Sequence, residues 1–291
     1  MPDPFESLRA PVTPVPPDPV FAARLRARIA RLLTPGGISV SDLTVDLDSP
    51  TATADLEPAA RPTRHGDIVF ASLNVPDVVR AATFFGAVLG WRYTPGSGAQ
   101  GRQVEGVNPH LGLWGGEPRS TLFLCYGVDD LDQALERVRA AGGVAGPASV
   151  RPYGPTADCV DPEGTPFALN ELTATTPAPA RPGQADLGYV TMEVRESARA
   201  RAFYGEVLGW RFHPGRVEDG WQVEDVVPLV GMRGGVEQPV AVPFYHVDDV
   251  ASAVARVRAA GGTATDPERQ PYGVSSECTD DQGTRFYLGE T

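Results

Sequence analysis

Apolar residues along the chain recur with two alternating periods, one typical of strands and one typical of amphipathic helices. A strand-like run ends at Leu73 and Val75, and a helical period then places four apolar residues on one face: Ala81, Phe84, Phe85 and Val88. Asp77 stands where a helix N-cap is expected, and Gly90 stands where the helix should stop. The pattern predicts a strand followed by a short helix.

The same strand-and-helix pattern occurs a second time, and short strand-like segments follow it. Residues 121–128 are strand-like, Asp130 stands at an N-cap position, and Gly142-Gly143 end the pattern. Between them a helical stripe is formed by Leu131, Ala134, Leu135 and Val138. The remainder consists of short strand-like segments with turn residues. We therefore interpret residues 65–172 as two halves, each of the type β-α-β-β-β.

The chain contains an internal repeat. Residues 67–172 align with 186–291 at one constant offset of 119 without a gap, and about 45 of roughly 106 pairs are identical. The clearest block pairs residues 84–92 (FFGAVLGWR) with 203–211 (FYGEVLGWR). This match indicates gene duplication and two domains of one fold, each expected to have eight strands and two main helices.

The segment before residue 65 differs from the repeats. Asp18-Pro19 is a good helix start, and an apolar face follows at Phe21, Leu25, Ile29 and Leu32. Residues 48–64 and 173–184 are rich in Pro, Ala and Thr and are interpreted as linkers. The predicted division is an N-terminal extension (1–64), a first domain (65–172), a linker (173–184) and a second domain (185–291). The helix packs either on its own domains or on another copy, which would give a homodimer.

Composition and charge narrow the choice of partners and compartment. The 291-residue chain has no apolar run long enough to span a membrane and no export signal at its start, so we expect a cytoplasmic protein. Its three cysteines have no C-x-x-C spacing, which favours reduced thiols. A net charge of -12 argues against nucleic-acid and membrane partners and leaves a small molecule as the expected one. All 25 basic residues are arginine, which excludes a catalytic lysine.

Three motifs, in the same order in both repeats, carry a resemblance to a known family. In the first repeat they are the run from Val75-Pro76-Asp77 to Gly90-Trp91, then Val128-Asp129-Asp130, then residues 161–167 (DPEGTPF). The chain thus resembles the vicinal oxygen chelate superfamily, which includes glyoxalases, extradiol dioxygenases and bleomycin-binding proteins. The resemblance implies an α+β fold, in which paired βαβββ modules form a curved, cup-like mixed sheet in each domain, with the ligand inside the cup.

In metal-dependent relatives the cup carries His or Glu on four strands. The resemblance places three of these positions, in the first and second repeat respectively, at Phe70 and Tyr189, at Phe123 and Val242, and at Ala168 and Tyr287. The fourth lies near Gly112-Leu113 and Gly231-Met232, where neither stretch contains His, Asp or Glu. Phenyl and methyl groups offer no donor to a divalent ion. We therefore expect neither a metal nor another cofactor.

Residues two apart on a strand share a sheet face, and this period selects the candidate ligand-binding residues. They are Phe70, Ser72, Trp114, Phe123 and Cys125 in the first repeat, and Tyr189, Thr191, Val242, Phe244 and Tyr287 in the second. The four histidines are unmatched across the repeats and are expected at the surface or in linkers, with His110 alone near a cup. Cys159 and Cys278 are expected to be buried and inert. No catalytic constellation is found.

Three functions remain open at this point. The leading hypothesis is a metal-independent protein of the glyoxalase/bleomycin-resistance type that binds an apolar or aromatic ligand in the sheet cup. A second is a metal-free isomerase, lyase or cyclase in which Glu105, Glu224 or a tyrosine moves protons. A third is an interaction protein whose cups are filled by their own side chains.

Overall fold

The computed structural model describes residues 61–96, 98–173, 176 and 182–290. The helix expected between residues 18 and 36 and most of both expected linkers lie outside these residues. The described residues belong to one compact unit.

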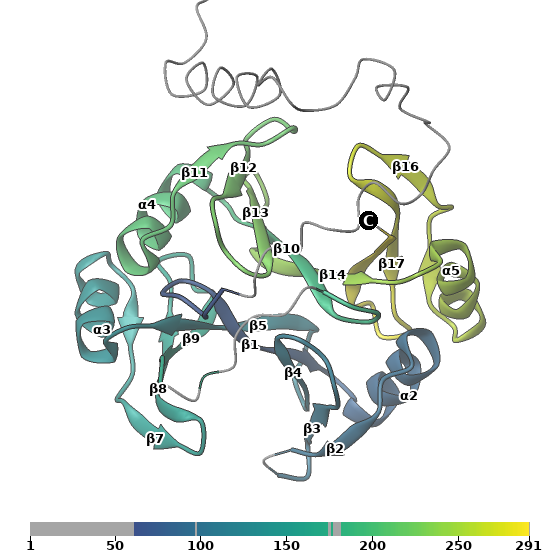
Figure 1. Cartoon of the computed structure of the whole chain (residues 1–291), viewed down its shortest axis with the longest axis horizontal. Helices are drawn as coiled ribbons and strands as arrows, with labels where there is room; N and C mark the ends of the chain where they lie inside the picture. The colour runs from purple at the N-terminus through teal and green to yellow at the C-terminus, as the bar shows by residue number, and fades with distance from the viewer. Residues whose placement is uncertain (1–60, 97, 174–175, 177–181, 291) are drawn as a thin grey trace, which may run out of the picture. The chain divides into compact units, whose positions relative to one another are not determined.

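The first repeat forms one mixed sheet with two helices. Its first half contains β1 (Ile68–Val75), α2 (Val78–Leu89), β2 (Tyr93–Pro95), β3 (Gly101–Val104) and β4 (His110–Gly115). Its second half contains β5 (Thr121–Val128), α3 (Leu131–Ala140), β6 (Val144–Ala145), β7 (Ser149–Arg151), β8 (Gly154–Val160) and β9 (Pro166–Glu171). The strand order is β2-β3-β4-β1-β5-β9-β8-β6, and β7 pairs with β8 beside this path (Figure 1).

The second repeat follows the same plan. Its elements are β10 (Leu187–Glu193), α4 (Ser197–Leu208), β11 (Phe212–Pro214), β12 (Gly220–Val223), β13 (Leu229–Arg233), β14 (Val240–His246), α5 (Val250–Ala259), β15 (Thr263–Ala264), β16 (Glu268–Gln270), β17 (Gly273–Thr279) and β18 (Arg285–Glu290). The sheet order is β11-β12-β13-β10-β14-β18-β17-β15, with β16 on β17. The α+β fold and the paired halves are confirmed.

The expected number of strands was wrong by one in each repeat, because nine strands form each sheet. The extra strands are β7 and β16, each of three residues. All three residues of β7 are exposed. Such a segment has no buried side that an apolar alternation could reveal.

Local chemistry accounts for the helix ends. The Asp77 carboxylate accepts hydrogen bonds from the backbone amides of Val79 and Arg80, and Gly90 ends α2 with a φ of 75°. Asp130 caps α3 by accepting from the Gln133 amide. No described helix is long and apolar enough to cross a membrane.

The two repeats pack through equivalent contacts. Helix α2 packs against α5, α3 against α4, and β5 against β14 (Figure 1). The indole of Trp91 donates to the carbonyl of Ala185 at 3.1 Å, and the matching indole of Trp210 donates to Gly66 at 3.0 Å. Each repeat therefore stabilises the other with the same surface.

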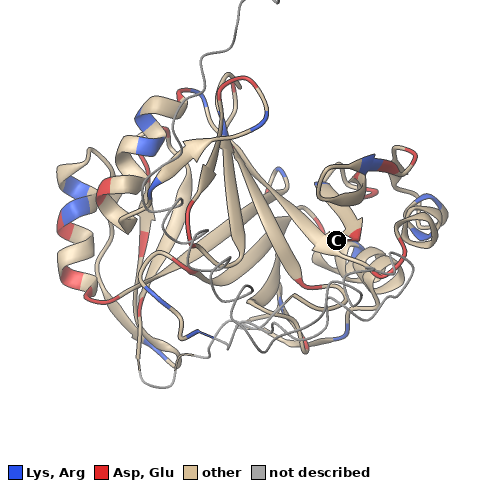
Figure 2. Cartoon of the chain, turned by 45° about the horizontal axis from the view of Figure 1, so that its top comes forward, with Lys and Arg blue, Asp and Glu red and all other residues tan. Residues whose placement is uncertain are grey.

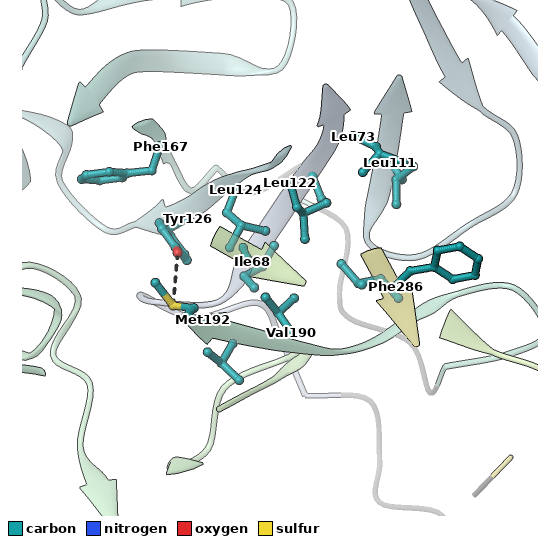
Figure 3. Packing of buried hydrophobic residues seen from close by; sticks show 14 of the residues in the cluster. Ile68, Leu73, Leu111, Leu122, Leu124, Tyr126, Phe167, Val190, Met192 and Phe286 are labelled. Atoms are coloured by element: carbon teal, nitrogen blue, oxygen red, sulfur yellow. Dashed lines mark hydrogen bonds between the residues drawn. The ribbon is translucent and has the colours of Figure 1, made fainter. Parts of the chain in front are cut away.

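The shared core lies on the helix-bearing faces of the two sheets and combines aromatic and aliphatic residues from both repeats (Figure 3). The Phe84 ring packs against Gly262 of the second repeat, and the Phe203 ring packs against Gly143 of the first. Tyr126 donates a weak hydrogen bond to the sulfur of Met192, with a donor–acceptor distance of 4.0 Å. The charged residues lie mostly on helices and loops (Figure 2).

Each sheet also has a second face that this core does not include. On β1, Ala71, Leu73 and Val75 are buried in the core, while the alternate residues Phe70, Ser72 and Asn74 are only half-buried. Among the described residues, four buried apolar residues lie outside the core cluster: Cys125, Ala168, Val242 and Phe244. They belong to the same face as Phe70 or its counterpart Tyr189. We call this face cup 1 in the first repeat and cup 2 in the second.

Candidate functional site: two sheet cups

Strand register brings the candidate residues of cup 1 together. Phe70 lies opposite Cys125, and Ser72 lies opposite Phe123. Trp114 lies on β4, opposite Asn74. Directly paired residues point to the same side of a sheet, so the five candidates of the first repeat share one face.

Cup 1 presents aromatic surface beside small residues. Phe70 and Phe123 are half-buried, and Trp114 is 37% exposed. The Phe70 ring lies over Gly112, where an added Cβ would approach the ring to 3.2 Å. Cys125 is buried, and burial raises the pKa of its thiol to about 12. The thiol is therefore protonated at neutral pH and contributes shape rather than nucleophilicity.

The candidates of the second repeat also share one face. Tyr189 lies opposite Phe244, and Thr191 lies opposite Val242. Phe244 in turn lies opposite Tyr287 on β18. The Tyr189 hydroxyl donates to Oε1 of Gln222 at 3.1 Å. Burial raises the pKa of Tyr189 to about 12, so its phenol stays protonated at neutral pH.

A band of charged side chains across cup 2 is a feature that the sequence reasoning missed. The Glu193 carboxylate is within 2.8 Å of both Arg233 and Arg285, and Arg285 also pairs with Glu277 at 3.1 Å. Glu193 has the parity of Tyr189 and Thr191 on β10, so the period-two rule could have placed it on this face. Its ion pair with Arg285 on β18 crosses the intervening strand β14, and this reach is not revealed by the sequence.

The histidines are placed differently from one another. His110 is exposed on β4 opposite Phe70, at the edge of cup 1. His246 was expected at the surface, and this was wrong: it is half-buried, with its ring centroid 6.0 Å from that of Phe244. The reason is that Gly188 on the neighbouring strand leaves room for the imidazole. Burial lowers the pKa of His246.

The two glutamates considered for proton transfer form ion pairs at the surface. Glu105 and Glu224 are exposed and pair with Arg92 at 3.3 Å and Arg211 at 2.9 Å. Cys159 and Cys278 are buried in the core, as expected, and burial raises the pKa of each thiol to about 11. These placements give no support to acid–base chemistry by either glutamate in a cup.

The side chains present do not fit a metal centre of the kind that the resemblance implies. The positions that the resemblance assigns to ligands in cup 1 hold Phe70, Phe123 and Ala168, which have no oxygen or nitrogen donor. Within the described ranges, no group of three or more His, Cys, Asp or Glu residues is arranged to hold a metal ion. No step of chemistry through a metal follows from these residues.

Comparison with known proteins agrees with the architecture. Residues 68–170 and 189–289 each match the glyoxalase-like domain. The chain is 26% identical over 251 residues to the anthracycline biosynthesis protein DauV of Streptomyces sp. (strain C5), covering 75% of this chain and 90% of that protein. It is also 26% identical over 250 residues to the anthracycline biosynthesis protein DnrV of Streptomyces peucetius, with the same coverage.

Solved structures with this fold include enzymes, one of them with bound manganese. The Mn(II)-bound glyoxalase from Novosphingobium aromaticivorans superposes with a TM-score of 0.62 at 16% identity, covering 78% of this chain and 83% of that one. The 2,3-dioxygenase LapB from Pseudomonas sp. KL28 gives 0.61 at 15% identity, covering 79% and 94%. At such identities the likeness extends to the fold alone.

Proposed function

The chain belongs to the glyoxalase-like domain family, and from this premise we propose that it is a metal-independent protein that binds a flat apolar or aromatic small molecule in a sheet cup. The observation that carries the proposal is the half-exposed aromatic surface of Phe70, Phe123 and Trp114 on a face outside the core. Apolar and aromatic side chains with a few polar groups are the usual lining of small-molecule sites.

The relatives support the same class of ligand. The two proteins of 26% identity are named for anthracycline biosynthesis, and anthracyclines contain a flat system of fused rings. A flat ring gains both burial and stacking against phenyl and indole faces. We therefore choose doxorubicin, an anthracycline, as the first probe.

Metal independence is part of the proposal because the ligand positions carry phenyl and methyl groups. Elemental analysis of protein purified without chelators should find less than about one metal ion per chain, since no donor set is available to retain one. Stoichiometric zinc, nickel, iron or manganese bound in a cup would contradict the proposal.

The cysteines and the net charge bear on the cellular location and the binding partners of the protein. We propose a cytoplasmic protein, because its three cysteines are free and buried. The net charge of -12 supports a small molecule rather than nucleic acid or a membrane surface as its partner. We also propose that two copies associate into a homodimer through the N-terminal segment.

The test is a fluorescence titration of doxorubicin with the wild-type chain and with a double variant, Phe70→Ala/Tyr189→Ala. Removing an aromatic face from both cups should weaken binding by about 1 to 3 kcal/mol through lost burial and stacking. Val79→Ala on the exposed side of α2 is the matched control and should bind as the wild type does. If the double variant binds doxorubicin as tightly as the wild type but melts at a lower temperature, the cup residues serve as core and the proposed function is wrong.

A further inference from the structure

We infer that cup 1 is the binding cup and that it selects a flat aromatic cation, whereas cup 2 is closed by its own side chains. This inference rests on the proposed function and sharpens it, because it assigns the ligand to one repeat and gives it a charge. Three differences between equivalent positions of the two cups carry it.

The first difference is the size of the side chains on β5 and β9 compared with β14 and β18. Where cup 1 has Cys125 and Ala168, cup 2 has Phe244 and Tyr287. The Cζ end of the Phe244 ring lies against Gly289, and the ring is in edge contact with Tyr272, with ring centroids 6.4 Å apart. Cup 2 therefore already holds an aromatic ring at the place where cup 1 has a thiol and a methyl group.

Burial of the neighbouring position agrees with this difference. Val242 in cup 2 is only 1% exposed, although it is small. Phe123 at the equivalent position of cup 1 is larger and yet remains half-buried. A larger side chain that stays more accessible indicates that less of the protein covers it.

The second difference is the band of ion pairs that crosses cup 2. The Glu193 side chain, only 6% exposed, holds Arg233 and Arg285 over the sheet face. The equivalent positions of cup 1 are Asn74, Trp114 and Pro166, which cannot form such a band. A flat apolar ligand in cup 2 would have to displace or bury these charges, which is unfavourable.

The third difference is the charge that each cup leaves unpaired. Asp158 lies opposite Ala168, and its neighbours Ala157 and Cys159 are in the core, so the Asp158 side chain is on the face of cup 1. Within the described part of the chain Asp158 makes no ion pair, whereas its counterpart Glu277 is paired with Arg285. An exposed carboxylate without a cation attracts a positively charged ligand group.

The tyrosine at the tip of the β7–β8 hairpin, Tyr153, also differs in its contacts from its counterpart in cup 2. Tyr153 is 64% exposed, and no ring of the described residues packs against it, whereas its counterpart Tyr272 packs on Phe244. Burial of part of the ring raises the pKa of the Tyr153 phenol. The ligand ring contacts Tyr153 in cup 1 as the Phe244 ring contacts Tyr272 in cup 2.

The experiment compares two fluorescent three-ring probes of opposite charge, 9-aminoacridine as the cation and 9-anthracenecarboxylate as the anion. The full-length wild-type chain should bind the cation about tenfold more tightly than the anion, as one charge-assisted contact predicts. Asp158→Asn should abolish most of this preference, and Tyr153→Ala should weaken both probes at least about fivefold by removing a ring contact. The matched variants Glu277→Gln and Tyr272→Ala of cup 2 should leave both affinities unchanged.

The outcomes separate this inference from the proposed function. Loss of binding in the Tyr272→Ala and Glu277→Gln variants, with wild-type affinity in Tyr153→Ala and Asp158→Asn, would place the ligand in cup 2 and overturn the inference while the proposed function stands. A cation preference that survives in Asp158→Asn would overturn the assigned charge. Failure of the wild type to bind either dye or doxorubicin would overturn both. A melting curve for each variant shows that the chain is folded during the titration.

Discussion

The two repeats keep several equivalent contacts where they face each other and differ more where they face their cups. Trp91 and Trp210, for example, make the same hydrogen bond to the opposite repeat. In the cups, by contrast, Cys125 corresponds to Phe244, and Trp114 corresponds to Arg233. Duplication therefore produced one scaffold with two unequal cups.

The reason for the difference is that each kind of surface has different neighbours. A core residue of one repeat packs against the other repeat, as Phe84 does on Gly262, so a change in its volume is felt in both. A cup residue has solvent, a ligand or its own strand neighbours on one side. A substitution there affects only the cup that contains it, so the two cups can acquire different functions.

The largest loss of stability is expected from a cavity in the core that the two repeats share. Phe84→Ala and Phe203→Ala should each lower the free energy of unfolding by about 3 to 5 kcal/mol, because both rings are buried and would leave a void. The two variants should be nearly equal, since the contacts are equivalent. Urea unfolding followed by far-UV circular dichroism measures both. A loss below about 1 kcal/mol in either variant would show that the repeats do not depend on each other as described.

A smaller loss should distinguish the two cups. Glu193→Ala in cup 2 removes the carboxylate that holds two arginines and should cost about 1 to 3 kcal/mol, because the half-exposed arginines regain water only in part. Asn74→Ala, at the equivalent position of cup 1, loses one hydrogen bond from Ser72 and should cost about 0.5 to 1 kcal/mol. The same urea titration compares them, and equal losses would remove the energetic contrast between the cups.

Much of this contrast could be predicted from the sequence, because it depends on period-two parity. Parity placed Phe70 and Phe123 together on one face, and Asp77 predicted the start of α2. Parity does not describe how far a long side chain reaches, so the ion pair between Glu193 and Arg285, across the intervening β14, was not foreseen. The placement of His246 was missed for a similar reason, since it depends on a glycine in a neighbouring strand.

The half-buried His246 of cup 2 has glycine as its counterpart in cup 1, so it should make stability depend on pH through the second repeat. Burial lowers the pKa of His246, opposed in part by the Asp186 carboxylate, while the unfolded chain keeps the ordinary value of about 6.5. The unfolded state then binds more protons, so the contribution of neutral His246 is present above about pH 6.5 and is lost as the pH falls below it. Melting temperatures of the wild type and His246→Gln at about pH 7.5 and about pH 5.5 should show a smaller drop in the variant. An equal drop would assign the acid sensitivity to other groups.

The smallest expected effect concerns the hairpin tyrosines in the absence of any ligand. Tyr272 is 51% exposed but rests with its ring edge on Phe244, so Tyr272→Ala should cost about 0.5 to 1.5 kcal/mol. Tyr153 has no such ring contact within the described residues, so Tyr153→Ala should change stability by less than about 0.5 kcal/mol. A ligand in cup 1 should supply the missing contact, so a saturating probe should stabilise the wild type more than Tyr153→Ala and should stabilise Tyr272→Ala as much as the wild type. Thermal melts of the three proteins with and without 9-aminoacridine measure these differences. If Tyr153→Ala is already destabilised without the probe and gains the same stabilisation with it, the tyrosine is a structural part of the hairpin and the two cups are more alike than their sequences indicate.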